Sequence, residues 1–161
     1  MARKYTPETL IPMFRLAAEL RKQMIEAGFT DNGGAIHSAE RILHILGLRL
    51  CFPDLSHINN LRRHPRAPFS ESALLAYQAG KRVLIEHINP HRALTRLEID
   101  KLQSGIADSD FLTFVKANYQ LALLTEAETA RLNKLNRTKI EPNRLEQAGI
   151  KLVSSGRTRK T

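Results

Sequence analysis

The residue pair Glu86-His87 is the part of this sequence whose residue types best suit catalysis. It ends a β-branched apolar run, and Asn118 and Asn133 follow later in the chain. Metal-assisted phosphodiester hydrolysis needs an imidazole that deprotonates water, oxygen or nitrogen ligands for a divalent ion, and a group that orients the imidazole. We therefore predict His87 as general base, Asn118 as its orienting partner, and Glu86 and Asn133 as metal ligands.

Three expected elements would position these four residues. Residues 81–88 have the β-branched pattern of a strand, and residues 118–124 alternate as a second strand. Thr125, with Glu128 three positions later, forms a capping box that predicts a helix over residues 126–136. Two strands that feed one helix can hold all four side chains at a single edge.

This order of elements and residues resembles the ββα-metal core of the HNH, or His-Me finger, endonucleases. The resemblance covers residues 81–136 and extends to the trailing segment AGIKLV. It implies a nuclease that uses a divalent metal, Mg²⁺, with His87 as the catalytic base. The chain departs from the family pattern because two helices separate the strands, Thr129 stands where a metal-binding His is often found, and no Cys pairs exist for a structural zinc. Because of these departures, a degenerate site is an alternative to an active one.

A structural interpretation of the same residues also stays open. His87 would then be a hydrogen-bonding residue at the end of a strand, Glu86 would pair with a neighbouring Lys or Arg such as Arg82, and Asn133 would be an ordinary exposed helix residue. Rival chemistry has less support, since neither nucleotide-binding glycine motif is present and the Asn-Pro pair before His91 prevents His87 and His91 from sharing one helix.

The positive charge of the chain indicates a polyanionic partner. The 25 Lys and Arg against 16 Asp and Glu give +9, and residues 131–161 hold nine of the bases against only Glu141 and Glu146. Low aromatic content, 6% with no Trp, favours a duplex over extended single strands, and we expect DNA rather than RNA. The expected nucleic-acid contacts are Arg131, Lys134, Arg137, Lys139, Arg157, Arg159 and Lys160.

The same charge is also compatible with two roles that need no partner. Cations near residue 136 would stabilise the end of a helix through its dipole, and the last residues would form a solubilising tail. Arg62, Arg63, His64 and Arg66 form a second basic cluster in irregular chain.

The whole pattern predicts a small, helix-rich α+β protein. We expect one domain over residues 1–153, with a helical N-terminal region over residues 1–80 and an HNH-like region over residues 81–153, followed by a basic flexible tail 154–161. Helices are expected at 6–28, where Pro12 moves the true start nearer Thr9, and at 38–47, the second ending at Gly47 before a short strand. Further helices are expected at 70–80, 90–103, 108–117 and 142–148, with a last strand at 150–153.

The N-terminal helices also support a different class of function. Helices 6–28 and 38–47 would form a homodimer in a non-catalytic regulatory or protein-interaction module, and the Glu86-His87 segment would be structural. The lone Cys51 and the lack of a secretory signal lead us to expect a reducing cytoplasm. No stretch approaches the roughly 20 apolar residues of a membrane span, so no membrane partner is expected.

Overall fold

A computed structural model describes residues 5–153 of the chain. It has the expected fold class, a helix-rich α+β arrangement with one small antiparallel sheet. The contacts divide the chain into two compact units: Met1–Asp54 with His91–Tyr119, and Leu55–Pro90 with the chain from Gln120 onward. These boundaries differ from the expected division at residue 80, because the chain leaves the second unit after β1 and returns to it for β2.

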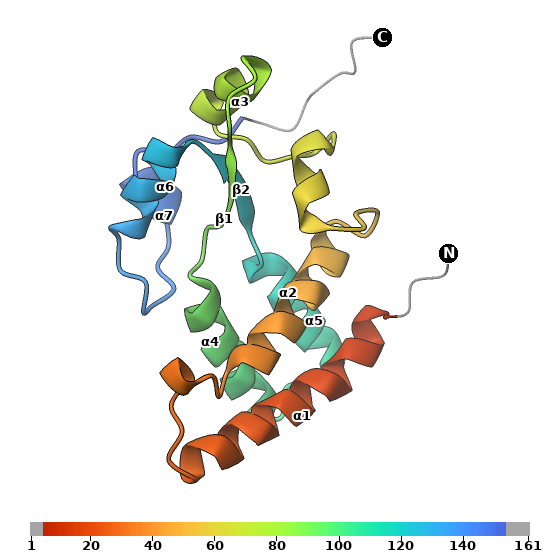
Figure 1. Cartoon of the computed structure of the whole chain (residues 1–161). Coiled ribbons are helices and arrows are strands. Elements are labelled where there is room, and N and C mark those ends of the chain that lie inside the picture. Colours follow the sequence, from red (N-terminus) through yellow and green to blue (C-terminus); the bar gives the residue numbers. More distant parts are fainter. Residues whose placement is uncertain (1–4, 154–161) are drawn as a thin grey trace. The chain divides into compact units, whose positions relative to one another are not determined.

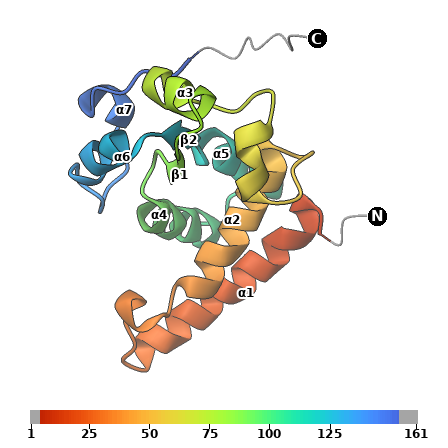
Figure 2. The same ribbon diagram turned by 45° about the horizontal axis from the view of Figure 1, so that its top comes forward.

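The first unit is built from helices alone in its described residues. Its core is apolar and includes Leu10, Phe14, Leu43, Ile99 and Phe111. The longest helix lies along the second helix in both views (Figures 1 and 2). The elements are α1 (Pro7–Glu26), the 3-10 turn η1 (Asp31–Gly33), α2 (His37–Cys51), α4 (His91–Gln103) and α5 (Asp108–Asn118).

The second helix, α2, continues past the expected end at Gly47, so the predicted strand after it is wrong. Gly47 is needed for close packing rather than for termination. A Cβ at this position would lie 2.2 Å from ring atoms of Tyr119, which packs against the helix. The Tyr119 hydroxyl is 2.9 Å from His44 Nδ1 on the same helix. The long-range contact with Tyr119 therefore explains the glycine that the sequence pattern assigned to a cap.

Asp31 connects three elements of the first unit. Its carboxylate accepts two hydrogen bonds of 2.8 Å from Arg21 on α1 and one of 2.9 Å from Arg96 on α4. The hydrogen bond from Arg21 is the largest influence on the pKa of Asp31, which lies at about 2 against burial that acts to raise it. Asp31 is therefore ionised in the folded protein near neutral pH.

The second unit is organised around an antiparallel strand pair. Leu84 pairs with Leu124, Ile85 with Leu123, Glu86 with Ala122, and His87 with Leu121. In Figure 2, α6 and α7 lie beside this pair. The elements are η2 (Ile58–Arg63), α3 (Glu71–Gln78), β1 (Leu84–His87), β2 (Leu121–Leu124), α6 (Glu126–Asn133) and α7 (Arg144–Gln147).

Single bridges extend the pair on the β2 side. Phe69 bridges Leu123 in parallel orientation, and Ser70 bridges Leu152 in antiparallel orientation. The expected last strand at 150–153 is thus reduced to one bridge. The order across this sheet-like layer is β1, β2, the segment around Phe69, and the segment around Leu152.

The two faces of this layer carry separate apolar clusters, as alternation along a strand requires. On one face, Ala122 and Leu124 pack with Leu132, Ala148 and Ile150 from the α6 and α7 region. On the other face, Leu123 packs with residues that precede β1. These are Phe69, Ala73 and Val83.

Several expected boundaries shift in the structure. The predicted strand 118–124 begins only at Leu121, because Asn118 ends α5, and the predicted helix 126–136 ends at Asn133. The capping box of Thr125 and Glu128 is present as predicted. Among residues 5–153, no helix is both long enough and apolar enough to span a membrane. The predicted tail 154–161, with Arg157, Arg159 and Lys160, lies outside the described residues.

A buried carboxyl group in α4 makes the stability of the first unit depend on pH. Glu98 is 0% exposed, and neither of its carboxyl oxygens has a hydrogen-bond partner within residues 5–153. Burial raises the pKa of Glu98 from 4.5 to about 8, and the charge of Lys101 opposes this rise. The folded state therefore retains a proton that the unfolded chain releases, and stability falls as the pH rises from about 4.5 to about 8.

We expect Glu98→Gln to stabilise the protein above about pH 8 by on the order of a few kcal/mol, and to have little effect near pH 4.5. The amide keeps the shape of the side chain but removes the ionisation. Urea unfolding at both pH values measures the difference. The exposed Asp100→Asn on the same helix is the control. A pH-independent effect of Glu98→Gln would contradict the assignment.

Candidate functional site

Glu86 and His87 lie on opposite faces of β1. Residues directly opposite one another in an antiparallel pair share a face, and consecutive residues alternate between faces. Glu86 is opposite Ala122, which belongs to the cluster beneath α6 and α7. His87 is opposite Leu121 and therefore lies on the face of Leu123. The register thus separates the predicted metal ligand from the predicted base.

Glu86 faces the chain that follows α6. Its side chain is half-buried, and burial raises the pKa of Glu86 above its ordinary value, while the positive charge of Arg137 lowers it. Arg137 belongs to the loop after α6. The carboxyl group of Glu86 therefore lies near a cation, as the structural interpretation of this residue expects. That cation is Arg137 rather than Arg82. Arg82 instead pairs with Glu126, with 3.9 Å between Arg82 Nη1 and Glu126 Oε1.

Each of the two predicted asparagines is the last residue of a helix. Asn118 is the last residue of α5 in the first unit, where its side-chain amide donates a 2.9 Å hydrogen bond to the Phe114 carbonyl. Asn133 is the last residue of α6 in the second unit, and it is exposed. Thr129, at the position compared with a metal-binding His, is buried, and its hydroxyl has no hydrogen-bond partner in the described chain.

The predicted base and the predicted metal ligand of β1 do not share a face. A base that deprotonates a metal-bound water must lie on the same side as the ligands of the ion, whereas the carboxylate of Glu86 and the imidazole of His87 point to different faces. Over residues 5–153, no group of three or more His, Cys, Asp or Glu side chains is placed to hold a metal ion.

Four of the predicted basic residues lie in the last turn of α6 and in the chain that follows it. Arg131, Lys134, Arg137 and Lys139 are all exposed, and they define what we name the basic segment, residues 131–139. Arg131 Nε donates a 2.9 Å hydrogen bond to the Ala148 carbonyl, which leaves the rest of its guanidinium at the surface. The side chains of the other three make no ion pair and no hydrogen bond with the described part of the chain.

Arg144 holds the basic segment in place, and sequence reasoning did not single it out. Its side chain is 4% exposed and donates hydrogen bonds to the carbonyls of Ile88 (2.8 Å), Asn136 and Leu132 (3.5 Å). These carbonyls belong to the end of α6, the loop after it and the chain after β1. Burial lowers the pKa of Arg144, the charge of Glu141 raises it and that of Arg137 lowers it. The structural role of Arg144 could not be recognised from the sequence, because a buried arginine in a basic region has the same local pattern as an exposed one.

The second predicted basic cluster divides into structural and exposed residues. Arg62 donates hydrogen bonds of 3.1 and 2.9 Å to the Val83 carbonyl, and His64 is buried. Arg63 and Arg66 are exposed, and their side chains have no ion pair within residues 5–153. The cluster therefore adds two available cations to the same unit as the basic segment.

The positive charge of the protein belongs to the second unit. Its described residues, 55–90 and 120–153, hold 11 Lys and Arg against 6 Asp and Glu. The segments of the first unit, 1–54 and 91–119, hold 11 against 10. Dividing the chain into its two folded units therefore separates a basic part from a nearly neutral part more clearly than dividing it at residue 131. The reason is that Arg62, Arg63 and Arg66 belong to the same unit as the C-terminal bases.

Comparison with family models, with curated protein sequences and with solved structures finds no match to this chain.

We expect Arg144→Met to destabilise the protein by about 2–4 kcal/mol, because it leaves the Ile88 and Asn136 carbonyls without their donor and removes one of the donors to Leu132, while it keeps the apolar stem. Arg137→Met, at an exposed position of the same region, is the matched control and should change stability by less than about 0.5 kcal/mol. Urea unfolding measures both. Equal midpoints for the two variants would show that Arg144 does not anchor the segment.

Proposed function

We propose that this protein binds nucleic acid through the basic segment of its second unit, with duplex DNA as the preferred form. The observation that carries the proposal is the set of three exposed cations, Lys134, Arg137 and Lys139, whose side chains form no ion pair within residues 5–153, although the charge of Arg137 acts on the nearby Glu86. A phosphate backbone gains affinity from such side chains because each contact releases condensed counterions. Cations that are already paired would first have to break their own ion pairs.

The alternative, that these cations only stabilise a helix end, accounts for Lys134 alone. Lys134 is the C-cap residue of α6, where a positive charge suits the helix dipole. The dipole effect is confined to the last turn, and Arg137 and Lys139 lie beyond it. Arg144 also uses its buried contacts to hold the loop that presents them. The two outer cations therefore favour an external anion.

The lack of aromatic surface near the basic segment supports recognition of a backbone rather than of splayed bases. Phe69 and Tyr77 are the aromatic residues of the second unit in residues 55–90 and 120–153, and their rings pack together at 5.2 Å. Phe69 is buried and Tyr77 is half-buried. Proteins that grip single strands usually stack bases on exposed aromatic rings. Duplex binding through phosphates needs no such ring.

The binding proposal predicts a salt-dependent interaction that the triple variant Lys134→Ala/Arg137→Ala/Lys139→Ala weakens. Log affinity falls with log salt concentration, and each lost phosphate contact should make this negative slope shallower by about 0.9. Fluorescence anisotropy with a labelled DNA duplex, titrated over a range of salt concentrations, measures affinity and slope together. Single-stranded DNA and RNA of the same sequence test the preference for the duplex.

A control of equal charge is available in the first unit. Lys22, Arg41 and Lys116 are exposed, so Lys22→Ala/Arg41→Ala/Lys116→Ala removes the same net charge from a different place. We expect this control to retain most of the affinity. If both triple variants lose affinity equally, net charge rather than the basic segment is responsible. Affinity that is independent of salt would reject the proposal altogether.

Hydrolysis is a separate proposal with less support. Glu86 and His87 face opposite sides of β1, so the binding function is proposed without a catalytic step. Plasmid nicking with Mg²⁺ tests it directly, with His87→Ala beside His57→Ala as a control at another histidine. Mg²⁺-dependent nicking that only His87→Ala abolishes would establish the endonuclease function.

One observation favours the second candidate, an interaction module that dimerises through its N-terminal helices. Helix α1 buries one apolar face, yet Met13, Leu16 and Leu20 are 42%, 72% and 50% exposed. Their spacing of three and four residues places them on one side of the helix. The same stripe on a second copy, related by a two-fold axis, would cover them.

The dimer proposal predicts that Leu16→Glu/Leu20→Glu is monomeric while the wild type is a dimer at micromolar concentration. Charges placed within an apolar seam should prevent association without disturbing the buried face of α1. Size-exclusion chromatography with light scattering measures the mass, and circular dichroism confirms the fold. The control Leu75→Glu/Leu97→Glu alters exposed leucines on α3 and α4. A monomeric wild type, or a dimer retained in the α1 variant, would contradict the proposal.

A further inference from the structure

The segment around Leu152 is an edge of the sheet-like layer with an open side. The Glu71 N–H donates a 3.1 Å hydrogen bond to the Lys151 carbonyl, and the Val153 N–H donates a 2.8 Å bond to the Phe69 carbonyl. These bonds flank the Ser70 and Leu152 bridge. In this antiparallel pattern, the N–H and C=O of the middle residue point away from the neighbouring segment. Those of Leu152 have no hydrogen-bond partner among residues 5–153.

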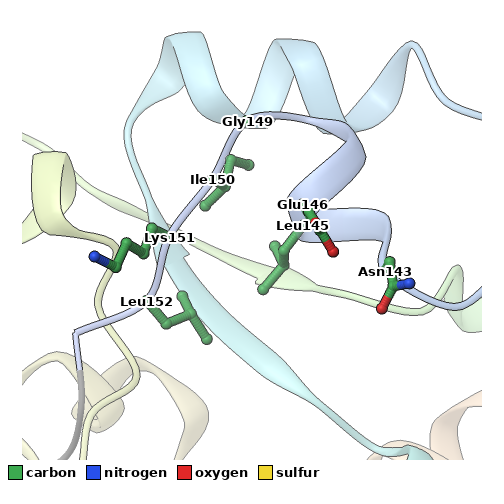
Figure 3. A pocket seen from close by; sticks show the side chains of 7 residues that line it. All are labelled: Asn143, Leu145, Glu146, Gly149, Ile150, Lys151 and Leu152. Carbon is green, nitrogen blue, oxygen red and sulfur yellow. The ribbon is translucent and has the colours of Figure 1, made fainter.

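A pocket lies against the same segment. It has a volume of about 540 Å³ and is open to the surface. Figure 3 shows its lining, with side chains from α7 and from the chain that leads to Leu152. Leu145, Ile150 and Leu152 provide its apolar lining. Asn143, Glu146, Gly149 and Lys151 complete it.

We propose that this edge binds an extended peptide segment of a partner protein by strand addition. The partner backbone would pair with the N–H and C=O of Leu152, and one apolar side chain would enter the pocket beside Leu145. An open strand edge next to an apolar pocket supplies both requirements of this binding mode, backbone hydrogen bonds for affinity and a side-chain pocket for specificity. The site is distinct from the basic segment and does not depend on nucleic-acid binding.

The chemistry of the edge selects a peptide over other occupants. A phosphate backbone carries no N–H donors and no apolar side chain for the pocket. A second copy of the chain would bring together two units that each hold 11 bases against 6 acids. At the edge itself Lys151 pairs with Glu71 and Glu146 lines the pocket, so it is the charge of the unit as a whole that attracts a peptide whose flanking residues are acidic. The expected ligand is therefore extended, apolar at its centre and acidic at its ends.

Hydrogen exchange in the free protein provides the first test. The Val153 amide is bonded to Phe69 and should be protected, whereas the adjacent Leu152 amide should exchange close to the rate of an unstructured chain. Selection from a displayed library of random peptides against the full chain then supplies a probe. Addition of the selected synthetic peptide should slow exchange at Leu152 by at least about tenfold and leave Val153 nearly unchanged.

The same probe separates strand pairing from simple apolar contact. A version of the peptide N-methylated at its central residues keeps every side chain but loses backbone donors, and it should bind at least about tenfold more weakly. Leu145→Ser should weaken binding of the unmodified peptide, while Leu75→Ser on α3 should not. Because Leu145 is half-buried, circular dichroism checks its fold, and the N-methylated peptide tests the wild type without any mutation.

Three results would overturn the proposal. The first is a Leu152 amide that is already protected in the free chain. The second is a selection that enriches no peptide, or peptides whose binding is insensitive to N-methylation. The third is a dimer that persists in Leu16→Glu/Leu20→Glu together with loss of peptide binding, which would assign the edge to a second copy.

Discussion

The hydroxyl group of Ser70 joins the segments of the second unit on which its other features depend. It donates a 2.6 Å hydrogen bond to Glu128 on α6 and accepts a 3.0 Å bond from the Ala73 N–H at the start of α3. The Glu128 carboxylate also accepts the Thr125 N–H at 2.9 Å, which completes the capping box. The Ser70 backbone meanwhile bonds to Leu123 and bridges Leu152. One buried network thus connects the starts of two helices with three strand-like segments, and each of its polar atoms depends on the others because water is excluded.

Arg144 performs a related task at the opposite end of α6. A buried guanidinium here donates to the Leu132 carbonyl, which also accepts from the Leu135 N–H, and to the carbonyls of Asn136 and Ile88. The loop after α6 is consequently held by a side chain rather than by regular secondary structure. This leaves Lys134, Arg137 and Lys139 at the surface in a defined region, near the half-buried Glu86. The unit therefore separates a cation that supports the fold from cations that are available to a partner.

Local signals in the sequence were sufficient for much of the secondary structure. Thr125 and Glu128 correctly predicted the start of α6, since a capping box involves residues only three positions apart. The helix end predicted at Gly47 is wrong because this glycine is required by its contact with the Tyr119 ring, which lies far along the chain. Asn118 was assigned to a strand because the alternating pattern of residues 118–124 does not reveal where α5 ends. The candidate site failed to converge for a related reason: adjacent residues of a strand, such as Glu86 and His87, alternate between faces.

The sequence by itself determined the helix-rich α+β class, the capped start of α6 and the presence of a basic C-terminal region, because these depend on composition and on neighbours within one helical turn. The start of α1 was less certain from sequence, because Pro12 favours a start near Thr9, whereas the helix begins at Pro7 and includes Pro12. The tertiary structure decided which charges are available. Arg62 and Arg144 donate to backbone carbonyls inside the second unit, while Arg63, Arg66, Arg137 and Lys139 remain exposed. Within residues 5–153, it also left the N–H and C=O of Leu152 without a partner beside a pocket. Burial and pairing between distant segments set these outcomes, and such contacts leave no mark in the local pattern of residues.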